Sequence, residues 1–137
     1  MIKIDLRKIS VALLFFVLVF LGALIRPVRI ANGDGAVTLW LWAWQEGQIN
    51  FVNSVTHRPV AISFRMSWRF SEFSAQTDSG TEDYYTAGLY RWNDVMARER
   101  TRNIRYCSEV GVSITMGRKT IRTQGGCISV TLLWPPF

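Results

Sequence analysis

The chain has 137 residues, of which 49% are hydrophobic and 13% aromatic, with a formal net charge of +6. This length allows one domain with a modest core, and the apolar content excludes a disordered chain. A basic chain suits nucleic acid, anionic lipid or an acidic protein surface, and the compartment decides between these partners.

An apolar segment lies close to the N-terminus. Residues 1–8 are basic, and an uncharged run follows over residues 9–25. As a helix this run would cover about 25 Å, close to the roughly 30 Å of a bilayer's hydrocarbon core. We therefore predict a cytoplasmic N-terminus over 1–8, a transmembrane helix over 9–28, a linker over 29–36 and a β-domain over 37–137.

A cleaved signal peptide is the alternative to an anchor. Cleavage requires small residues at the first and third positions before the cut. Ala31 would suit the first position, but Arg29 would then occupy the third, so an uncleaved anchor is favoured. Because short basic N-termini rarely cross, the domain is expected in the periplasm of a bacterium, on a single-pass inner-membrane protein. Nucleic acid is then excluded as a direct partner.

The rest of the chain alternates with a period of two, which is typical of β-strands. The alternation is cleanest over residues 60–70, where one face is apolar and the other polar, as in an antiparallel sheet. Both faces are apolar over 37–44, which predicts a strand buried on both sides or one in contact with a partner. The expected strands are 37–44, 49–55, 60–70, 84–91, 95–107, 110–116, 119–123 and 127–134.

The segment 95–102 is open to two interpretations, because it also suits a short basic helix; a strand is favoured. About eight short antiparallel strands predict a small closed barrel, which leaves no exposed edges, or a sandwich.

Cys107 and Cys127 are the two cysteines of the chain. Outside the cytoplasm an even number favours a disulfide between them. Two unrelated buried thiols are the alternative. The absence of a Cys-x-x-Cys motif argues against redox catalysis.

The sequence lacks the residue patterns of common catalytic sites. His57 is the single histidine and lies in a predicted turn, with no nucleophile and orienting carboxylate nearby. The pair Glu82 and Asp83 falls in a polar segment and is expected to be solvated. We therefore expect no enzyme activity, no metal site and no cofactor.

Two residue groups are candidates for binding. As a strand, the segment after residue 95 would place three arginines on one face, either solvated or facing a partner protein or lipid headgroups: Arg98, Arg100 and Arg102. Six apolar side chains either belong to the core or line a pocket for an apolar or amphipathic ligand: Trp40, Trp42, Phe51, Phe64, Met66 and Trp68.

The chain resembles the FidL-like, ToxS and VtrC proteins, which are periplasmic partners of ToxR-like membrane transcription regulators. The similarity lies in the alternating residues 62–70, in Ala-Gly-Leu-Tyr-Arg over 87–91, and in Arg100 followed by Ile-Arg-Tyr over 104–106. It implies a calycin-like barrel that forms a heterodimer with a regulator's periplasmic domain and stabilises it, in virulence signalling. It also implies a joint pocket for a bile-salt-like amphipath and a strand edge that pairs with the partner.

The expected function is therefore a membrane-anchored accessory protein of signal transduction. A structural component of an envelope secretion or pilus assembly is the alternative, since a basic face and a two-sided tryptophan strand would serve it equally well.

Overall fold

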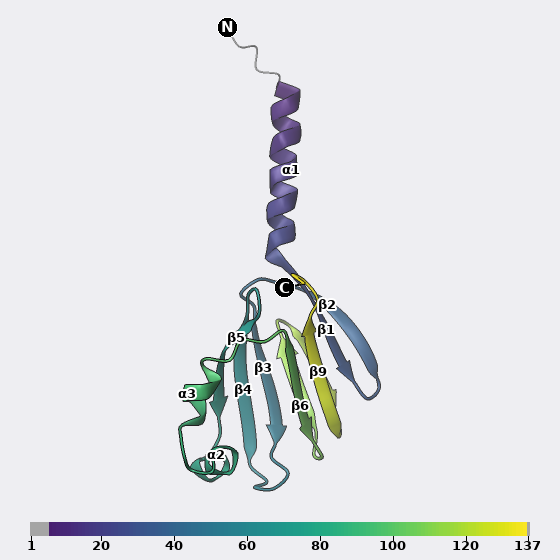
Figure 1. Cartoon of the computed structure of the whole chain (residues 1–137). Coiled ribbons are helices and arrows are strands. Elements are labelled where there is room, and N and C mark those ends of the chain that lie inside the picture. Colours follow the sequence, from purple (N-terminus) through teal and green to yellow (C-terminus); the bar gives the residue numbers. More distant parts are fainter. Residues whose placement is uncertain (1–5, 137) are drawn as a thin grey trace.

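The computed structural model describes residues 6–136. One long helix precedes a mostly β domain, which also contains two short helices (Figure 1). The elements are α1 (Leu6–Leu24), β1 (Ile25–Asn32), β2 (Gly35–Trp42), β3 (Glu46–Val52), β4 (Pro59–Met66), β5 (Phe70–Gln76), α2 (Ser79–Thr86), α3 (Trp92–Met96), β6 (Asn103–Ser108), β7 (Val112–Met116), β8 (Lys119–Thr123) and β9 (Gly126–Leu132).

The nine strands within residues 6–136 form two antiparallel sheets. One sheet has the order β2-β1-β9-β6, and the other has the order β5-β4-β3-β7-β8. Their apolar faces meet in one core, to which β4 contributes Val60, Ile62, Phe64 and Met66. The sandwich, one of the two predicted architectures, is therefore confirmed. The closed barrel is wrong, because no ladder joins the two sheets in the described chain.

The chain crosses between the sheets several times. β1 and β2 belong to the first sheet, and β3, β4 and β5 belong to the second. The chain then forms β6 in the first sheet, β7 and β8 in the second, and finally β9 in the first. The predicted disulfide is confirmed, since Cys107 on β6 and Cys127 on β9 are bonded and directly opposite in the ladder. The segment between the two cysteines contains β7 and β8, which belong to the second sheet.

The predicted linker over 29–36 is wrong, because β1 follows α1 without an intervening residue. β1 lies between β2 and β9, and its side chains Val28 and Ile30 are 0% and 2% exposed. Residues 25–28, predicted as the end of the apolar helix, belong to this strand as well. Pro27 is tolerated there although it lacks a backbone N–H to donate.

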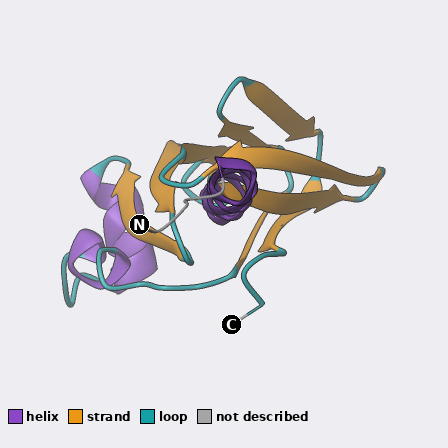
Figure 2. Ribbon diagram, turned by 90° about the horizontal axis from the view of Figure 1, so that it is seen from above, coloured by secondary structure: helices purple, strands orange, loops and turns teal. Residues whose placement is uncertain are grey.

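The strand predicted over 84–91 is wrong, because the chain forms α2 and a turn instead. The Asp78 carboxylate accepts a hydrogen bond from the backbone N–H of Thr81 and so caps α2. Hydrogen bonds from Thr81 also lower the pKa of Asp78. The segment 95–107 divides into the end of α3, a loop over 97–102, and β6. Seen along α1, these two short helices lie to one side of the sheets (Figure 2).

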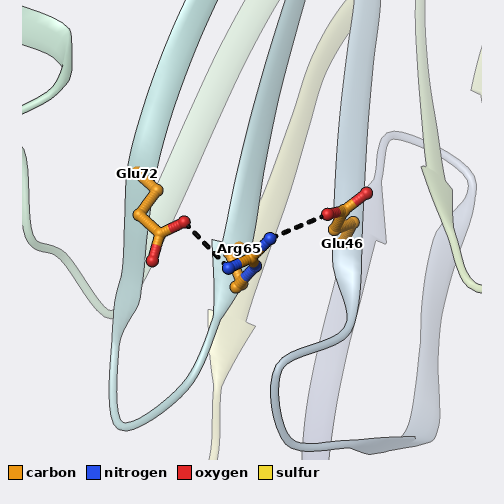
Figure 3. A network of polar contacts seen from close by, with 3 residues as sticks. All are labelled: Glu46, Arg65 and Glu72. Atoms are coloured by element: carbon orange, nitrogen blue, oxygen red, sulfur yellow. Dashed lines mark hydrogen bonds and ion pairs between the residues drawn. The ribbon is translucent and has the colours of Figure 1, made fainter.

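The outer face of the second sheet carries a small ion network. Arg65 on β4 is 3.0 Å from a carboxylate oxygen of Glu46 on β3 and 3.2 Å from one of Glu72 on β5 (Figure 3). All three side chains are well exposed, so this network contributes little to stability. On the inner face, the Phe64 ring covers Gly47, where an added Cβ would lie 2.3 Å from the ring.

Candidate functional site

A buried arginine joins α1 to the β-domain. Arg26 is 3% exposed. Its guanidinium donates hydrogen bonds to the carbonyl oxygens of Ala23 and Ile25, and its Nε donates to that of Ser67 at 3.1 Å. The same guanidinium lies 4.9 Å from the centre of the Trp68 ring, a cation–π distance. Burial lowers the pKa of Arg26 from its usual value. Arg26 therefore satisfies carbonyls at the end of α1 and links them to the β4–β5 turn.

Replacing Arg26 with Met should lower the free energy of unfolding by about 1–2 kcal/mol, because the carbonyls lose a charged donor. Arg29→Met is the matched control: Arg29 lies on the same strand and is exposed, so a change within about 0.5 kcal/mol is expected. Urea unfolding of both variants in detergent, followed by tryptophan emission, measures the difference. Equal stabilities would contradict the role of Arg26 at the junction.

Four exposed tryptophans gather where α1 meets the domain. Trp42 is 56% exposed, Trp44 63%, Trp68 59% and Trp134 50%. Trp42 is opposite Ile25, the first residue after α1. Trp134 follows Leu133, whose N–H donates to Pro27. We refer to these four side chains as the tryptophan belt.

The free edge of β2 lies beside the belt. β1 pairs with β2 along all eight residues, and within residues 6–136 no strand pairs with its other edge. Proteins protect exposed edges with charges, and the other edge strands follow this rule: β5 carries Glu72, β6 carries Arg105, and β8 carries Lys119 and Arg122. β2 has no charged residue, and its Trp40 is 73% exposed.

Compared with protein families, curated proteins and solved structures, this chain matches none of them. Its own features indicate the compartment. α1 is long and apolar enough to cross a membrane, and none of its residues is buried. A helix of this kind is either an anchor or a signal sequence. Together with the disulfide, which forms in oxidising compartments, it indicates an extracytoplasmic β-domain.

The six residues predicted to line one pocket divide into two groups. Phe51, Phe64 and Met66 are at most 7% exposed and belong to the core. The other three predicted pocket residues are exposed tryptophans near α1: Trp40, Trp42 and Trp68. The six side chains therefore do not come together at one place, since three lie in the core, two on the edge strand β2 and one in the β4–β5 turn.

An open groove occurs elsewhere, on the second sheet at the end far from α1. It encloses about 720 Å³ and is mostly apolar, with Arg58 and Arg122 in its lining. Phe51 is the one residue of the predicted pocket that contributes to it.

The three arginines predicted on one strand face lie in the loop over 97–102 instead. Arg98 and Arg100 are exposed, and an Nη of Arg100 bonds the carbonyls of Ala97 and Glu99. Arg102 donates to the Leu132 carbonyl at 2.9 Å. The loop runs towards the α1 end, because Thr101 bridges to Phe70 at the start of β5.

The structure places the acidic residues and the histidine weighed as catalytic candidates in separate surroundings. Glu82 accepts a hydrogen bond from the backbone N–H of Trp92 at 2.9 Å, and His57 lies in the turn between β3 and β4. Among residues 6–136, no group of three or more His, Cys, Asp or Glu side chains could hold a metal ion. Burial raises the pKa of Tyr106 to about 12, so this partly buried phenol stays neutral.

Sequence reasoning overlooked Arg26 and one member of the belt, Trp134. Two of the partners of Arg26, the Ser67 carbonyl and the Trp68 ring, come from the distant β4–β5 turn, so no local pattern reveals them. The belt had a detectable signal, since tryptophans that follow strand ends beside an apolar helix are typical of membrane interfaces.

Proposed function

We propose that this chain is a single-pass inner-membrane accessory protein whose periplasmic β-domain binds and stabilises the ectodomain of a partner membrane regulator. The observation that carries the proposal is the uncharged, unpaired edge of β2 beside α1. A strand edge of this kind binds another chain by adding its strand to the sheet, with backbone hydrogen bonds for affinity and side-chain contacts for specificity.

Retention of α1 as an anchor is supported by the position of β1. Cleavage after Ala31 would remove most of this strand, which lies inside its sheet and contributes Val28 and Ile30 to the core. Arg26 also bonds the carbonyl of Ala23 inside α1. A cut at Ala31 would therefore damage the domain that it released.

The direction of β2 favours a membrane protein as the partner. β1 runs away from α1, and β2 returns, so that Trp42 lies opposite Ile25. A strand added antiparallel to β2 must run away from the membrane, as β1 does. A strand that directly follows a membrane span of the same topology has this direction and starts at this level.

A second copy of this chain does not satisfy the same geometry. Antiparallel pairing of two β2 strands would place the two α1 helices at opposite ends of the dimer, where they could not enter one bilayer from the same side. Parallel pairing offsets the hydrogen bonds between the strands and so conflicts with the two-fold symmetry of most homodimers. A heterodimer fits both constraints. The resemblance to the ToxS type of protein supports a ToxR-like regulator as its second member.

The proposal is tested by photo-crosslinking in the cells that make the protein. A benzophenone amino acid at Thr38 on β2 should crosslink to one single-span membrane protein. The same amino acid at Thr120 on β8, an exposed strand position, is the control and should not. When that protein is added to the purified full chain, hydrogen exchange of the β2 amides should become slower. Unchanged exchange along β2 would refute edge pairing.

Trp40→Lys should weaken partner binding at least about tenfold, because tryptophans at interface centres often contribute 2 kcal/mol or more. The fold should be unaffected, since Trp40 is 73% exposed. Leu89→Lys is the matched control, because Leu89 is 81% exposed and lies beyond α2. Crosslinks from Thr38 to several subunits of a large complex would instead support the envelope-assembly alternative.

A further inference from the structure

We propose that the α1 end of the domain is a lipid-binding surface, with the tryptophan belt in the bilayer interface and neighbouring basic side chains on lipid phosphates. This inference shares with the proposed function the insertion of α1 in the membrane. It requires no protein partner.

The length of α1 places the belt at the interface. Its 19 residues rise about 28 Å, slightly less than the roughly 30 Å of the hydrocarbon core. Arg7 and Lys8 lie in its first turn and must reach the headgroups on the far side. Leu24 then lies near the outer boundary of the hydrocarbon, and the domain begins at the next residue. A short span is accommodated by drawing its flanking residues towards the bilayer.

Hydrogen bonds hold the belt at the level of Leu24. The backbone N–H of Ala43 donates to the Leu24 carbonyl at 2.6 Å, and the N–H of Trp44 donates to the Met66 carbonyl. Trp42 therefore lies in the first row of the β1–β2 ladder. The headgroup layer is about 5–8 Å deep on each side, which corresponds to roughly two rows of a strand. Trp42 and Trp44 are within this layer.

The other two belt members reach the same level from different strands. Trp68 is at the tip of the β4–β5 turn and is held against the guanidinium of Arg26. Trp134 is the residue after Leu133, whose N–H donates a hydrogen bond of 2.9 Å to the carbonyl of Pro27. Tryptophan is enriched at this depth because its ring is apolar and its N–H can bond to headgroups or water.

The charge around the belt suits anionic lipid. Arg69 follows Trp68 in the same turn, and Arg118 lies in the β7–β8 turn next to Gly117, which is close to Leu41 and Gln45. Both arginines are exposed. Arginine binds phosphate oxygens in a bidentate manner, and basic residues near the membrane are attracted to anionic leaflets. The phosphate of phosphatidylglycerol is the ligand chemistry that this surface fits.

Tryptophan emission from the full chain in nanodiscs tests the inference. α1 contains no tryptophan, so the emission reports on the domain alone. With phosphatidylglycerol lipids brominated near the glycerol end of the acyl chains, we expect quenching of roughly two-thirds of the emission, the share of four belt members among six tryptophans. Trp68→Phe should lower the quenched share. Trp92→Phe should raise it, because Trp92 stacks on Tyr85 in the α2–α3 region away from α1.

The role of the arginine charges is tested by comparing quenching in nanodiscs of brominated phosphatidylglycerol with quenching in nanodiscs of brominated phosphatidylcholine. Quenching should be stronger with the anionic lipid, and Arg69→Gln combined with Arg118→Gln should abolish the difference. Arg58→Gln combined with Arg122→Gln is the control, because these arginines line the groove at the opposite end, and it should keep the difference.

Two results would overturn the inference in a protein with an intact disulfide and an α1 that resists alkaline extraction. One is emission that brominated lipid does not quench. The other is belt quenching that appears only when the protein partner is removed, since the partner would then be the occupant. If the proposed function fails instead, Thr38 on β2 should give no crosslink to a membrane protein, whereas quenching by brominated lipid should be unchanged.

Discussion

A chain that begins at Ile25 should fold, whereas one that begins at Asn32 should not. The first lacks α1, which contributes no buried residue. The second also lacks β1, the only neighbour of β2 and a neighbour of β9 in the described chain. Burial of Val28 and Ile30 contributes roughly 1.5–3 kcal/mol for each side chain, and loss of β2 adds to this. Because small domains are stable by about 5–15 kcal/mol, the second chain should be unfolded.

Circular dichroism in the aromatic region and thermal unfolding, both in mild detergent, distinguish the two chains. The first should give a cooperative transition and a protected disulfide. The second should give neither. A folded chain that begins at Asn32 would contradict the interior role of β1 and would make a secreted, cleaved form possible, against the anchor that we propose.

Loss of the disulfide should be the second largest effect. Cys107→Ser combined with Cys127→Ser opens a loop closed over a sequence separation of 20 residues, and the chain-entropy relation gives a loss of about 3 kcal/mol. The loop contains β7 and β8, which belong to the other sheet. Reduction therefore removes a constraint on the β6–β9 pair and on the chain segments that cross between the two sheets.

Urea unfolding of oxidised protein, reduced protein and the double serine variant measures this loss. Reduced protein and the variant should agree with each other and differ from the oxidised form. Ser113→Ala is the control, because Ser113 lies within the same loop on β7 and makes only a long hydrogen bond, 3.5 Å, to the Asn50 carbonyl. Equal stability of the oxidised protein and the double variant would contradict the prediction.

Long, regular sequence patterns could be predicted well. The first part of the strand predicted over 60–70 corresponds to β4, although the chain turns over 67–69 and Phe70 begins β5, and the strand predicted over 119–123 is β8. The apolar run near the N-terminus forms α1. In each case the side chains of one element decide its structure, so a local pattern carries enough information.

Elements that depend on distant contacts could not be predicted in this way. β1 contains Pro27 and two arginines, and Arg26 donates a hydrogen bond to the distant carbonyl of Ser67. Tyr84 and Tyr85 favour strands, but Tyr85 stacks on Trp92 at 4.3 Å and stabilises the helical region. Asp78 three residues before Thr81 was a usable helix-capping signal there.

The candidate site was predicted only in part. Two apolar faces over 37–44 predicted a strand that is buried on both sides or in contact with a partner, and the structure shows a strand that is mostly exposed. Because β2 is at the edge of its sheet, Trp40 and Trp42 are exposed rather than buried. The belt further requires three separate chain segments to end at one level, which depends on the topology of both sheets.

The absence of any residue between α1 and β1 limits how this domain can search for other molecules. A domain on a flexible tether samples many orientations and loses that freedom when it binds. If α1 stays in the membrane, as we propose, the edge of β2 stands upright beside the bilayer, and its eight residues extend about 27 Å from the hydrocarbon boundary. Encounters are then reduced to sliding and turning in a plane, so a short upright strand on a neighbour could be captured even if its solution affinity were weak.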